Sequence, residues 1–78
     1  MVTVRFFAAA KAATKTNEVK ISANTVEQVL ALTIEKFPDL AAVLPKCSYL
    51  LNGIACSDLS TKLSPEDLLD VLPPFAGG

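Results

Sequence analysis

The sequence contains no histidine and only two cysteines among its 78 residues. Histidine is the commonest general base at neutral pH, so its absence argues against self-contained acid–base catalysis and excludes a histidine-containing metal site. Cys47 and Cys56 lie nine positions apart, with no Cys-x-x-Cys motif and no third ligand nearby, which argues against a zinc site. We therefore predict no metal site and no acid–base machinery of the chain's own.

Long apolar runs and a strong charge imbalance are also absent. The longest unbroken apolar runs, 6–10 and 40–44, have five residues each, whereas a membrane span needs about 18. Lys11 follows the first run too soon for the apolar region of a secretory signal. The net charge of −1 gives no general attraction to nucleic acid. We predict a cytoplasmic protein that binds neither membrane nor nucleic acid.

Apolar residues, in contrast, make up 51% of the chain. The length corresponds to one domain with no room for a second core. A domain of this size buries only about 60–65% of its unfolded surface. Some apolar side chains are therefore expected to stay outside, which favours a partner-binding face.

Alternating polarity at the start predicts a β-strand over residues 1–8. Its inner face carries three apolar side chains: Val2, Val4 and Phe6. Phe7 departs from this pattern because it falls on the side of Arg5. Phe7 fits either packing on the sheet surface or a partner-binding patch, and both interpretations stay open.

A second alternation predicts a strand over residues 18–22, with Val19 and Ile21 facing inward. Residues 9–16, rich in alanine and lysine, fit either a loop or a weak helical turn. Two short strands joined by about eight residues predict an opening hairpin with a long loop.

The spacing of apolar residues then changes to i, i+3, i+4, i+7 and i+11, which is one stripe of an amphipathic helix. The stripe consists of Val26, Val29, Leu30, Thr33 and Phe37. Thr25 with Gln28 gives a capping-box signal, and Asn24 with Glu27 is a rival N-cap.

Prolines divide the following segment. Pro38 ends the helix, because the residue before a proline is biased out of the α region. Residues 39–44 are predicted to form a second short helical piece, which Pro45 ends.

Asn52-Gly53 is the strongest hairpin signal in the sequence, because a type I′ turn needs two positive φ angles. This turn pairs three positions across the hairpin: Leu51 with Ile54, Leu50 with Ala55, and Tyr49 with Cys56. Cys47 then lies diagonally about 8 Å from Cys56, whereas a disulfide needs Cα atoms closer than about 7 Å. We interpret both cysteines as reduced packing residues.

A turn over residues 64–67 and a strand over residues 68–72, with Leu69 and Val71 on one face, complete the pattern. The order β-β-α-(short α)-β-β-β predicts an α+β fold. We expect the β-grasp (ubiquitin-like) arrangement, a mixed sheet of about five strands with one main helix packed on one face. The first and last strands are placed side by side and parallel at the centre by analogy, because periodicity does not determine strand order.

The last residues combine two rigid prolines with two glycines that carry no side chain. Pro73-Pro74 fixes φ near about −65° and keeps the start of the segment extended, and six extended residues reach about 20 Å. Gly77-Gly78 carries no Cβ, so partner groups can approach the terminal carboxylate closely. We expect one domain over residues 1–78, with 73–78 as a flexible extended tail.

Simpler interpretations exist for several of these residues. Gly77-Gly78 also fits a frayed end, although the prolines and Phe75 beside it argue against this. Phe75 fits an anchor for a partner, which we favour, or a side chain folded back on the core. Arg5 and Lys62 fit either steering of a partner's acidic groups or ordinary solvated charges.

Three segments carry a family resemblance: Val2-Thr3-Val4-Arg5-Phe6-Phe7-Ala8, Leu51-Asn52-Gly53, and Asp70-Val71-Leu72-Pro73-Pro74-Phe75-Ala76-Gly77-Gly78. Together they resemble the small subunit of molybdopterin synthase, the MoaD family of ubiquitin-like sulfur carriers. The likeness covers nearly the whole chain. Its most specific part is the ending L-P-P-x-x-G-G.

The resemblance implies a sulfur-donor subunit of a sulfur-transferase complex, without catalytic machinery of its own. By position, Gly78 is adenylated by a MoeB-like activating enzyme that uses ATP and then becomes a thiocarboxylate, with Gly77 as its slender neighbour. A MoaE-like large subunit is implied to catalyse sulfur transfer to cyclic pyranopterin monophosphate, which builds the molybdopterin dithiolene. No bound cofactor is implied, because the sulfur is held covalently. From their positions in the sequence, the candidate partner-binding residues are Phe75, Pro74, Pro73, Ala76 and Phe7.

The sequence departs from the family pattern in two places. Phe75 stands where many members carry a β-branched aliphatic residue, and residues 64–67 replace an Asp-Gly-Asp-Glu type of turn. The related thiazole-pathway carrier usually lacks the double proline, so Pro73-Pro74 favours the molybdopterin branch. The alternatives are a sulfur carrier for thiamine or cysteine synthesis, a ubiquitin-like protein modifier, and a small interaction domain without acyl chemistry.

Overall fold

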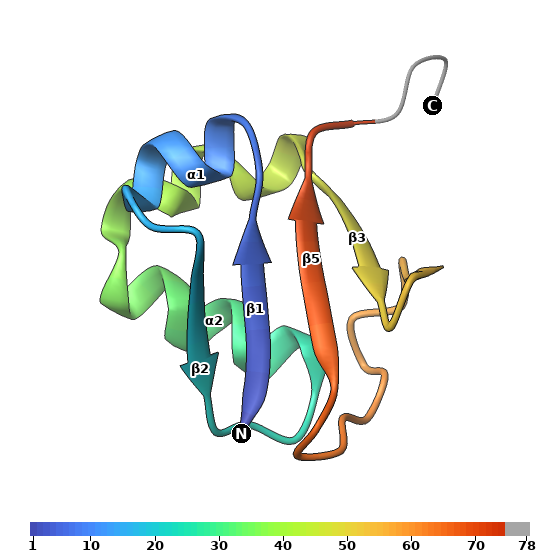
Figure 1. Cartoon of the computed structure of the whole chain (residues 1–78). Coiled ribbons are helices and arrows are strands. Elements are labelled where there is room, and N and C mark those ends of the chain that lie inside the picture. Colours follow the sequence, from blue (N-terminus) through green and yellow to red (C-terminus); the bar gives the residue numbers. More distant parts are fainter. Residues whose placement is uncertain (75–78) are drawn as a thin grey trace.

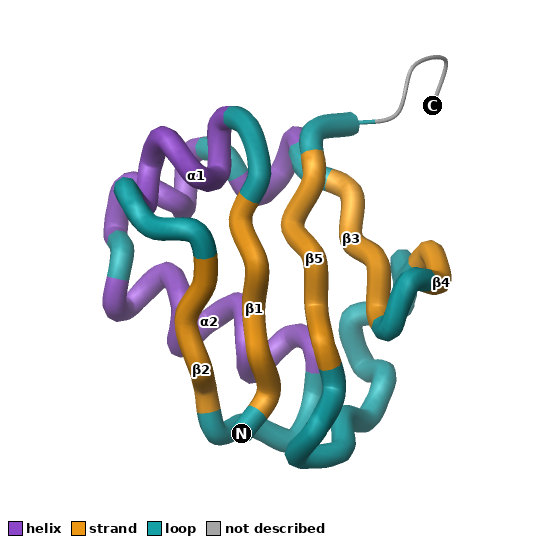
Figure 2. Tube along the Cα trace, viewed as in Figure 1, coloured by secondary structure: helices purple, strands orange, loops and turns teal. Residues whose placement is uncertain are grey.

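A computed structural model of the chain describes residues 1–74. These residues form one sheet with the strand order β2-β1-β5-β3-β4 (Figure 2). The strands are β1 (Val2–Phe6), β2 (Glu18–Ile21), β3 (Ser48–Leu51), β4 (Ile54–Ala55) and β5 (Leu68–Leu72). The helical segments are α1 (Ala9–Thr14), α2 (Val26–Lys36) and two 3-10 turns, η1 (Pro38–Ala42) and η2 (Leu44–Lys46). The helix α2 lies behind the sheet, whose front face is open (Figure 1).

Strands β1 and β5 lie side by side and parallel in the middle of the sheet, with Thr3 opposite Leu68 and Phe6 opposite Val71. Strand β2 pairs antiparallel with β1 on its other side, and β3 pairs antiparallel with β5. This is the β-grasp arrangement. The α+β class and the central parallel pair expected from the sequence are therefore confirmed.

The core lies between the sheet and α2. The inner face of β1 carries the predicted residues, all buried: Val2, Val4 and Phe6. Leu69 and Val71 of β5 are each 0% exposed. The ring of Phe6 meets that of Phe37 edge to face, with centroids 6.0 Å apart, a favoured geometry for aromatic pairs. The predicted inner faces of both strands are confirmed.

Helix α2 begins at the predicted capping box. The hydroxyl of Thr25 accepts a hydrogen bond from the backbone N–H of Gln28 at 3.2 Å. The side chain of Gln28 accepts one from the backbone N–H of Asn24 at 2.7 Å. Thr25 is thus the N-cap and the rival, Asn24, is not. The helix buries most of its predicted stripe: Val26, Val29, Leu30 and Thr33, with Phe37 half-buried beyond its end.

Some boundaries differ from those predicted. The first strand ends at Phe6, because Ala8 has a φ of 52°, which is not an extended conformation. Residues 9–14 form α1, so the helical alternative for this segment is correct. The second helical piece consists of η1 and η2, and Pro45 lies inside η2 instead of ending a helix. A proline is accepted there because the first turn of a helix does not need its N–H.

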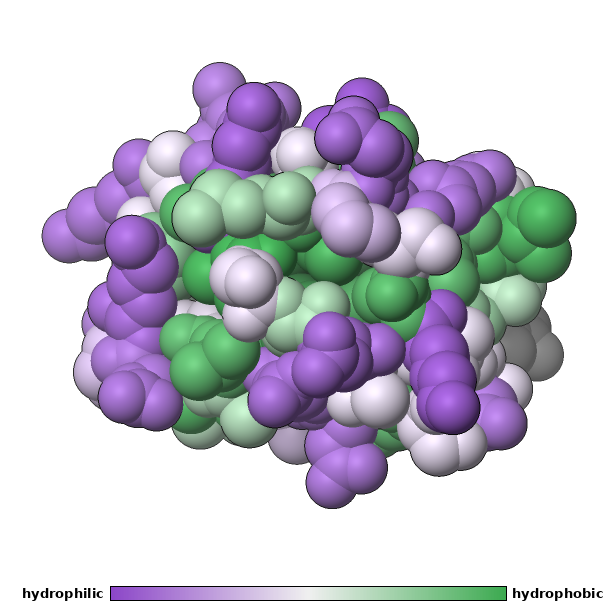
Figure 3. Space-filling model, turned by 90° about the horizontal axis from the view of Figure 1, so that it is seen from below, coloured by the Kyte–Doolittle hydropathy of each residue, from purple (hydrophilic) through white to green (hydrophobic). Residues whose placement is uncertain are grey.

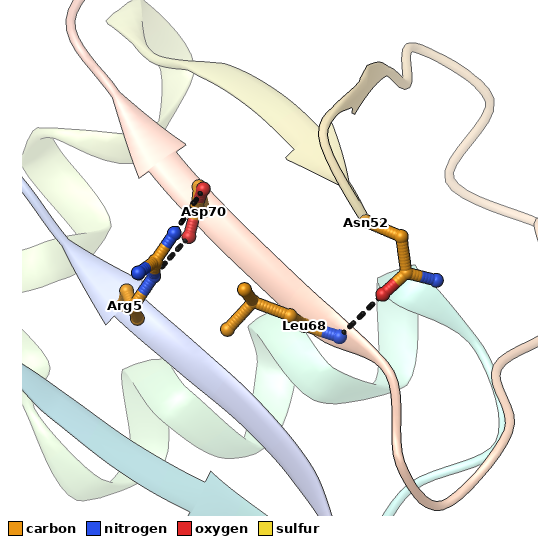
Figure 4. A network of polar contacts seen from close by, with 4 residues as sticks. All are labelled: Arg5, Asn52, Leu68 and Asp70. Atoms are coloured by element: carbon orange, nitrogen blue, oxygen red, sulfur yellow. Dashed lines mark hydrogen bonds and ion pairs between the residues drawn. The ribbon is translucent and has the colours of Figure 1, made fainter.

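The β3–β4 hairpin turns as predicted. Asn52 and Gly53 have φ angles of 51° and 82°, the positive values of a type I′ turn. The register pairs Leu50 with Ala55 and Leu51 with Ile54. The side-chain oxygen of Asn52 also accepts a hydrogen bond from the backbone N–H of Leu68 at 2.9 Å, which ties the turn to β5 (Figure 4).

Both cysteines are free and half-buried. The thiol of Cys47 contacts the carbonyl oxygen of Val43 at 3.3 Å, and that of Cys56 contacts the carbonyl oxygen of Asp58 at 3.6 Å. Both side chains pack against the core, which confirms their interpretation as packing residues.

The two ends of the sheet differ. Figure 3 looks at the end where β1 begins, and apolar side chains gather there inside a hydrophilic surround. A hollow of about 110 Å³ at this end is lined by residues that include Met1, Ala23, Leu63 and Pro65. Strand β5 leaves the sheet at the opposite end (Figure 1). In the described part of the chain, no helix has the length and apolar character that a membrane crossing requires.

Candidate functional site

The candidate site lies where β5 leaves the sheet. Pro73 and Pro74 directly follow Leu72, the last residue of β5, and both are exposed. The other predicted tail residues lie outside the described residues: Phe75, Ala76, Gly77 and Gly78. The site is therefore built from the residues that surround the start of the tail.

A cavity of about 310 Å³ lies beside the two prolines, and we call it the tail-base cavity. Its lining comes from residues 7–10, from Ala42, Val43, Lys46 and Cys47, and from Pro73 and Pro74. Three predicted partner residues, Phe7, Pro73 and Pro74, are thus brought together in one place. Apart from Lys46, the lining side chains are apolar or weakly polar, so the cavity suits an apolar side chain.

Phe7 is held at this position by the end of β1. Its backbone N–H donates to the carbonyl oxygen of Val71 at 3.1 Å, which continues the parallel pairing one step beyond the strand. The backbone N–H of Ala10 donates to the carbonyl oxygen of Phe7 at 3.2 Å, and Ala8 between them has a positive φ of 52°. The chain therefore turns sharply after Phe7, whose side chain stays 38% exposed at the cavity.

Arg5 connects the open face of the sheet to this cavity. Its guanidinium lies 5.7 Å from the centre of the Phe7 ring, within the range of a cation–π contact. The predicted position of Phe7 on the side of Arg5 is therefore confirmed. Arg5 also donates two hydrogen bonds to the carboxylate of Asp70, at 2.7 and 2.9 Å (Figure 4). These bonds are the main cause of the raised pKa of Arg5.

The open face of the sheet carries apolar side chains around this ion pair. Residues of β5 alternate, so Leu68, Asp70 and Leu72 face away from the core residues Leu69 and Val71. Leu50 of β3 lies opposite Asp70 and shares its face. Three leucines of this face, Leu50, Leu68 and Leu72, are only half-buried. They form an apolar stripe that runs toward the tail base, as expected for a partner-binding face.

Cys47 is the one thiol that lines the tail-base cavity in the described part of the chain. Burial raises the pKa of this thiol. A raised pKa keeps the thiol protonated at neutral pH, and the thiolate is the reactive form. Cys47 is therefore a packing residue of the cavity wall and not an activated nucleophile.

The described residues of the site form an apolar cavity bordered by exposed side chains. Within residues 1–74, no group of three or more Cys, Asp or Glu side chains gathers where it could hold a metal ion. The sequence interpretation missed the Arg5–Asp70 pair and the contribution of Lys46 and Cys47. The first was detectable once β1 and β5 were placed in parallel. The contribution of Lys46 and Cys47 had no local signal in the sequence, because η2 and the residue that follows it reach the cavity only through the packing of the fold.

The ThiS family profile matches residues 4–78, which is nearly the whole chain. The chain belongs to the ThiS family. Among curated protein sequences, none matches significantly.

Several solved structures are similar to this ThiS-family chain. Small archaeal modifier protein 1 from Methanosarcina acetivorans is 29% identical with a TM-score of 0.87, and the match covers 99% of this chain and 95% of that one. A chain of the complex of subunits 1 and 2 of molybdopterin-converting factor from Helicobacter pylori is 31% identical with a TM-score of 0.76, covering 99% and 97%. The Amycolatopsis orientalis BexX/CysO complex contains a match at 20% identity and a TM-score of 0.84, covering 100% of both chains.

These matches confirm the resemblance found in the sequence. The chain is a ubiquitin-like sulfur carrier of the ThiS/MoaD type with the β-grasp fold. The CysO match, at 20% identity, supports the fold alone. The Helicobacter pylori chain was solved in a complex with a second subunit.

Proposed function

We propose that this chain is the sulfur-carrier small subunit of molybdopterin synthase. The observation that carries the proposal is the exit of the central strand β5 through Pro73-Pro74, beside an apolar cavity that Phe7 also lines. The 31% identity to the Helicobacter pylori molybdopterin-converting factor chain supports this branch of the family. The double proline supports it further, because the thiazole-pathway carriers usually lack it.

In the proposed reaction, the Gly78 carboxylate attacks the α-phosphate of ATP on a MoeB-like activating enzyme. The products are an acyl-adenylate and pyrophosphate. Sulfur at the hydrosulfide level then attacks the acyl-adenylate carbonyl and displaces AMP, which leaves a thiocarboxylate on Gly78. Gly77 adds no side chain next to the reacting carbonyl, so enzyme groups can approach it closely.

The thiocarboxylate then enters the MoaE-like large subunit and gives its sulfur to cyclic pyranopterin monophosphate. Two such transfers build the dithiolene of molybdopterin. The chain supplies the reach of its tail and a docking face, while the partner supplies the acids and bases. Pro73-Pro74 reduces the entropy that the tail loses on insertion, because its φ angles are already fixed. Phe75 and Ala76 are proposed to contact the partner together with the tail-base cavity.

The proposal is tested by reconstitution with the full chain. Incubation with ATP, the activating enzyme and a sulfur source should give the mass gain of one oxygen replaced by sulfur, measured by intact mass spectrometry. Addition of the large subunit and cyclic pyranopterin monophosphate should then yield molybdopterin. Deletion of Gly78 should abolish both, whereas Glu27→Gln on the exposed face of α2 should change neither. If the chain without Gly78 still supports molybdopterin formation, the proposal is wrong.

A second candidate function is protein modification through Gly78. The observation that favours it is the similarity to small archaeal modifier protein 1, with a TM-score of 0.87 at 29% identity. In this case Gly78 would be joined to lysine side chains of other proteins through an isopeptide bond. Tagged chain expressed in its own host would give a ladder of conjugates whose lysines carry residues 63–78 after trypsin digestion, because Lys62 is the last tryptic site of the chain. No conjugates together with normal molybdopterin formation would favour the carrier over the modifier.

A further inference from the structure

A row of alternating charges crosses the open face of the sheet and ends at an exposed edge. Asp70 of β5 lies opposite Arg5 of β1, and Arg5 lies opposite Glu18 of β2. The guanidinium of Arg5 binds Asp70 through two hydrogen bonds, of which the shorter is 2.7 Å. The row therefore reads negative, positive, negative. It stops at Glu18, because β2 is the first strand of the sheet and has a neighbour only on its β1 side.

The outer edge of β2 also presents backbone hydrogen-bonding groups whose direction follows from the pairing with β1. The N–H of Phe6 donates to the carbonyl oxygen of Asn17 at 2.8 Å, so these opposed residues form a hydrogen-bonded pair. Such pairs alternate along an antiparallel ladder, and the backbone groups of Glu18 and Lys20 therefore point away from β1. In the described residues no strand meets these groups. The carbonyl oxygen of Glu18 accepts one hydrogen bond, from the hydroxyl of Thr16 at 3.4 Å. Its second lone pair and the other outward groups can bind another strand.

We propose that β2 pairs antiparallel with β2 of a second copy of this chain, about a two-fold axis at Val19. In this register Glu18 lies opposite Lys20 of the second copy, and Lys20 lies opposite its Glu18. Both residues present outward backbone groups, so these two positions form hydrogen-bonded pairs. Each row of alternating charges continues across the axis with a positive charge. Its order is Asp70, Arg5, Glu18 and then Lys20 of the second copy.

The same sequence disfavours other arrangements of this edge. Parallel pairing in register would set Glu18 opposite Glu18 and Lys20 opposite Lys20, and like charges directly opposite each other are destabilising. A shift by one residue would move Val19, which is half-buried on the core side, to the wrong face. Charges on an edge strand ordinarily discourage pairing with unrelated strands. Here their order favours one partner, which is a second copy in one register.

The proposed pairing leaves Pro73 and Pro74, the start of the tail, accessible. Strand β2 lies at the opposite edge of the sheet from β3 and β4. Strand β1 separates β2 from β5, the strand that leads into the tail (Figure 1). The tail-base cavity is lined by no residue of β2. Beside the edge, a groove of about 390 Å³ includes Lys20, Ile21 and Leu32 in its lining, and it leaves room for side chains of a second copy. Because the edge strand has only four residues, the dimer is expected to be weak.

Sedimentation velocity of the full chain over a wide concentration range tests the proposal. The wild type should show a monomer–dimer equilibrium. Glu18→Lys and Lys20→Glu should each weaken the dimer about tenfold or more, since both cross-strand pairs change from attraction to repulsion. The double variant Glu18→Lys/Lys20→Glu restores opposite charges across the axis and should recover dimerisation. Lys62→Glu, an exposed loop position with the same charge change, should behave as the wild type.

A zero-length carbodiimide cross-link gives a second readout. In an equal mixture of unlabelled and nitrogen-15-labelled chain, an amide between Glu18 and Lys20 should join one light and one heavy peptide. Far-UV circular dichroism of each variant verifies that the fold is kept. A chain that stays monomeric at all concentrations would overturn the proposal. A charge-swapped double variant that dimerises no better than the single variants would overturn the register.

Discussion

The guanidinium of Arg5 binds both carboxylate oxygens of Asp70, at 2.7 and 2.9 Å, across the parallel pair β1 and β5. The two residues are 65 positions apart in the sequence. The side chain of Arg5 is 41% exposed and that of Asp70 only 10%. The arginine therefore covers the carboxylate on an otherwise open sheet face, and the pair fixes the register of the strand that leads into the tail.

Arg5→Ala should lower the free energy of unfolding, because it leaves the buried carboxylate of Asp70 without its charged partner. The double variant Arg5→Ala/Asp70→Val removes the unpaired carboxylate as well, so it should be less destabilised than Arg5→Ala alone. Urea unfolding followed by circular dichroism measures both. Equal stability of Arg5→Ala and the wild type would show that the pair does not stabilise the sheet.

A second prediction concerns Asn52, whose side chain joins the β3–β4 turn to the start of β5. Its oxygen accepts from the N–H of Leu68 at 2.9 Å, and its amide donates to the carboxylate of Asp67 at 3.0 Å. Asn52→Ala loses both bonds and places alanine at a φ of 51°, so we expect a loss of about 1–3 kcal/mol.

Asn52→Gly is the matched control, because glycine tolerates the positive φ but makes neither side-chain bond. It should be intermediate between the wild type and Asn52→Ala in urea unfolding. If Asn52→Gly matched the wild type, the backbone conformation alone would explain the asparagine, and the two hydrogen bonds would contribute nothing measurable.

A third prediction follows from Ala8, which closes the turn after Phe7 with a φ of 52° and a ψ of −124°. These angles belong to a turn position that glycine normally occupies. Ala8→Gly should therefore raise the free energy of unfolding by up to about 1 kcal/mol, because the relief of strain exceeds the added entropy of the unfolded chain. Ala9→Gly, in the first turn of α1, should be destabilising. A destabilised Ala8→Gly in thermal unfolding would contradict the assignment of strain.

Local periodicity predicted much of the fold because its signals lie within single elements. The alternation in β1, the stripe and capping box of α2, and Asn52-Gly53 each define a structure from a few neighbouring residues. The boundaries at Ala8 and Pro45 were wrong because both depend on turns that the surrounding packing imposes. The strand order came from family analogy, and no periodicity could have supplied it.

The candidate site was predicted only as separate residues. Phe7 was a candidate partner residue because it departs from the alternation of the first strand, and Pro73-Pro74 because they begin the tail. The structure brings them together at one cavity. Lys46 and Cys47 complete its wall, although nothing near them in the sequence relates them to the tail. Arg5 and Asp70 likewise meet only through the parallel pairing of the first and last strands. Contacts between distant segments are the part that local pattern does not encode.

The pH dependence of stability gives a fourth prediction. Hydrogen bonds from the backbone N–H of Ser64 and from the side chain of Asn52 lower the pKa of Asp67, and bonds from Ser60 lower that of Asp58. A carboxyl group whose pKa is lower in the folded than in the unfolded state stabilises the fold. This stabilisation is fully present when the pH is above the unfolded-state pKa, about 3.9 for aspartate. This stability is lost as the pH falls through the folded pKa.

The free energy of unfolding should therefore decline as the pH falls below about 4. Asp67→Asn should make this decline shallower, and Asp58→Asn/Asp67→Asn shallower still. Urea unfolding at a series of pH values provides the measurement, with Glu66→Gln as the control for an exposed neighbouring carboxylate. Identical pH profiles for the wild type and Asp58→Asn/Asp67→Asn would refute this account.

The last prediction tests the tail-base cavity as the docking site of a partner. Phe7 is 38% exposed and lines the cavity beside Pro73-Pro74. Phe7→Ser should weaken binding to the proposed MoaE-like large subunit about 10- to 100-fold, the range expected when a partly exposed aromatic anchor is lost. It should change stability little, because Phe7 lies outside the buried core.

Two controls separate docking from folding. Ile54→Ser removes a more exposed apolar side chain, 73% accessible, from a strand that does not line the cavity, and it should leave affinity unchanged. Phe6→Leu acts in the core, so it should lower stability with little effect on affinity under folded conditions. Isothermal titration calorimetry with the large subunit measures all three variants. If Ile54→Ser weakened binding as much as Phe7→Ser, the partner would dock on apolar surface in general and not at the tail base.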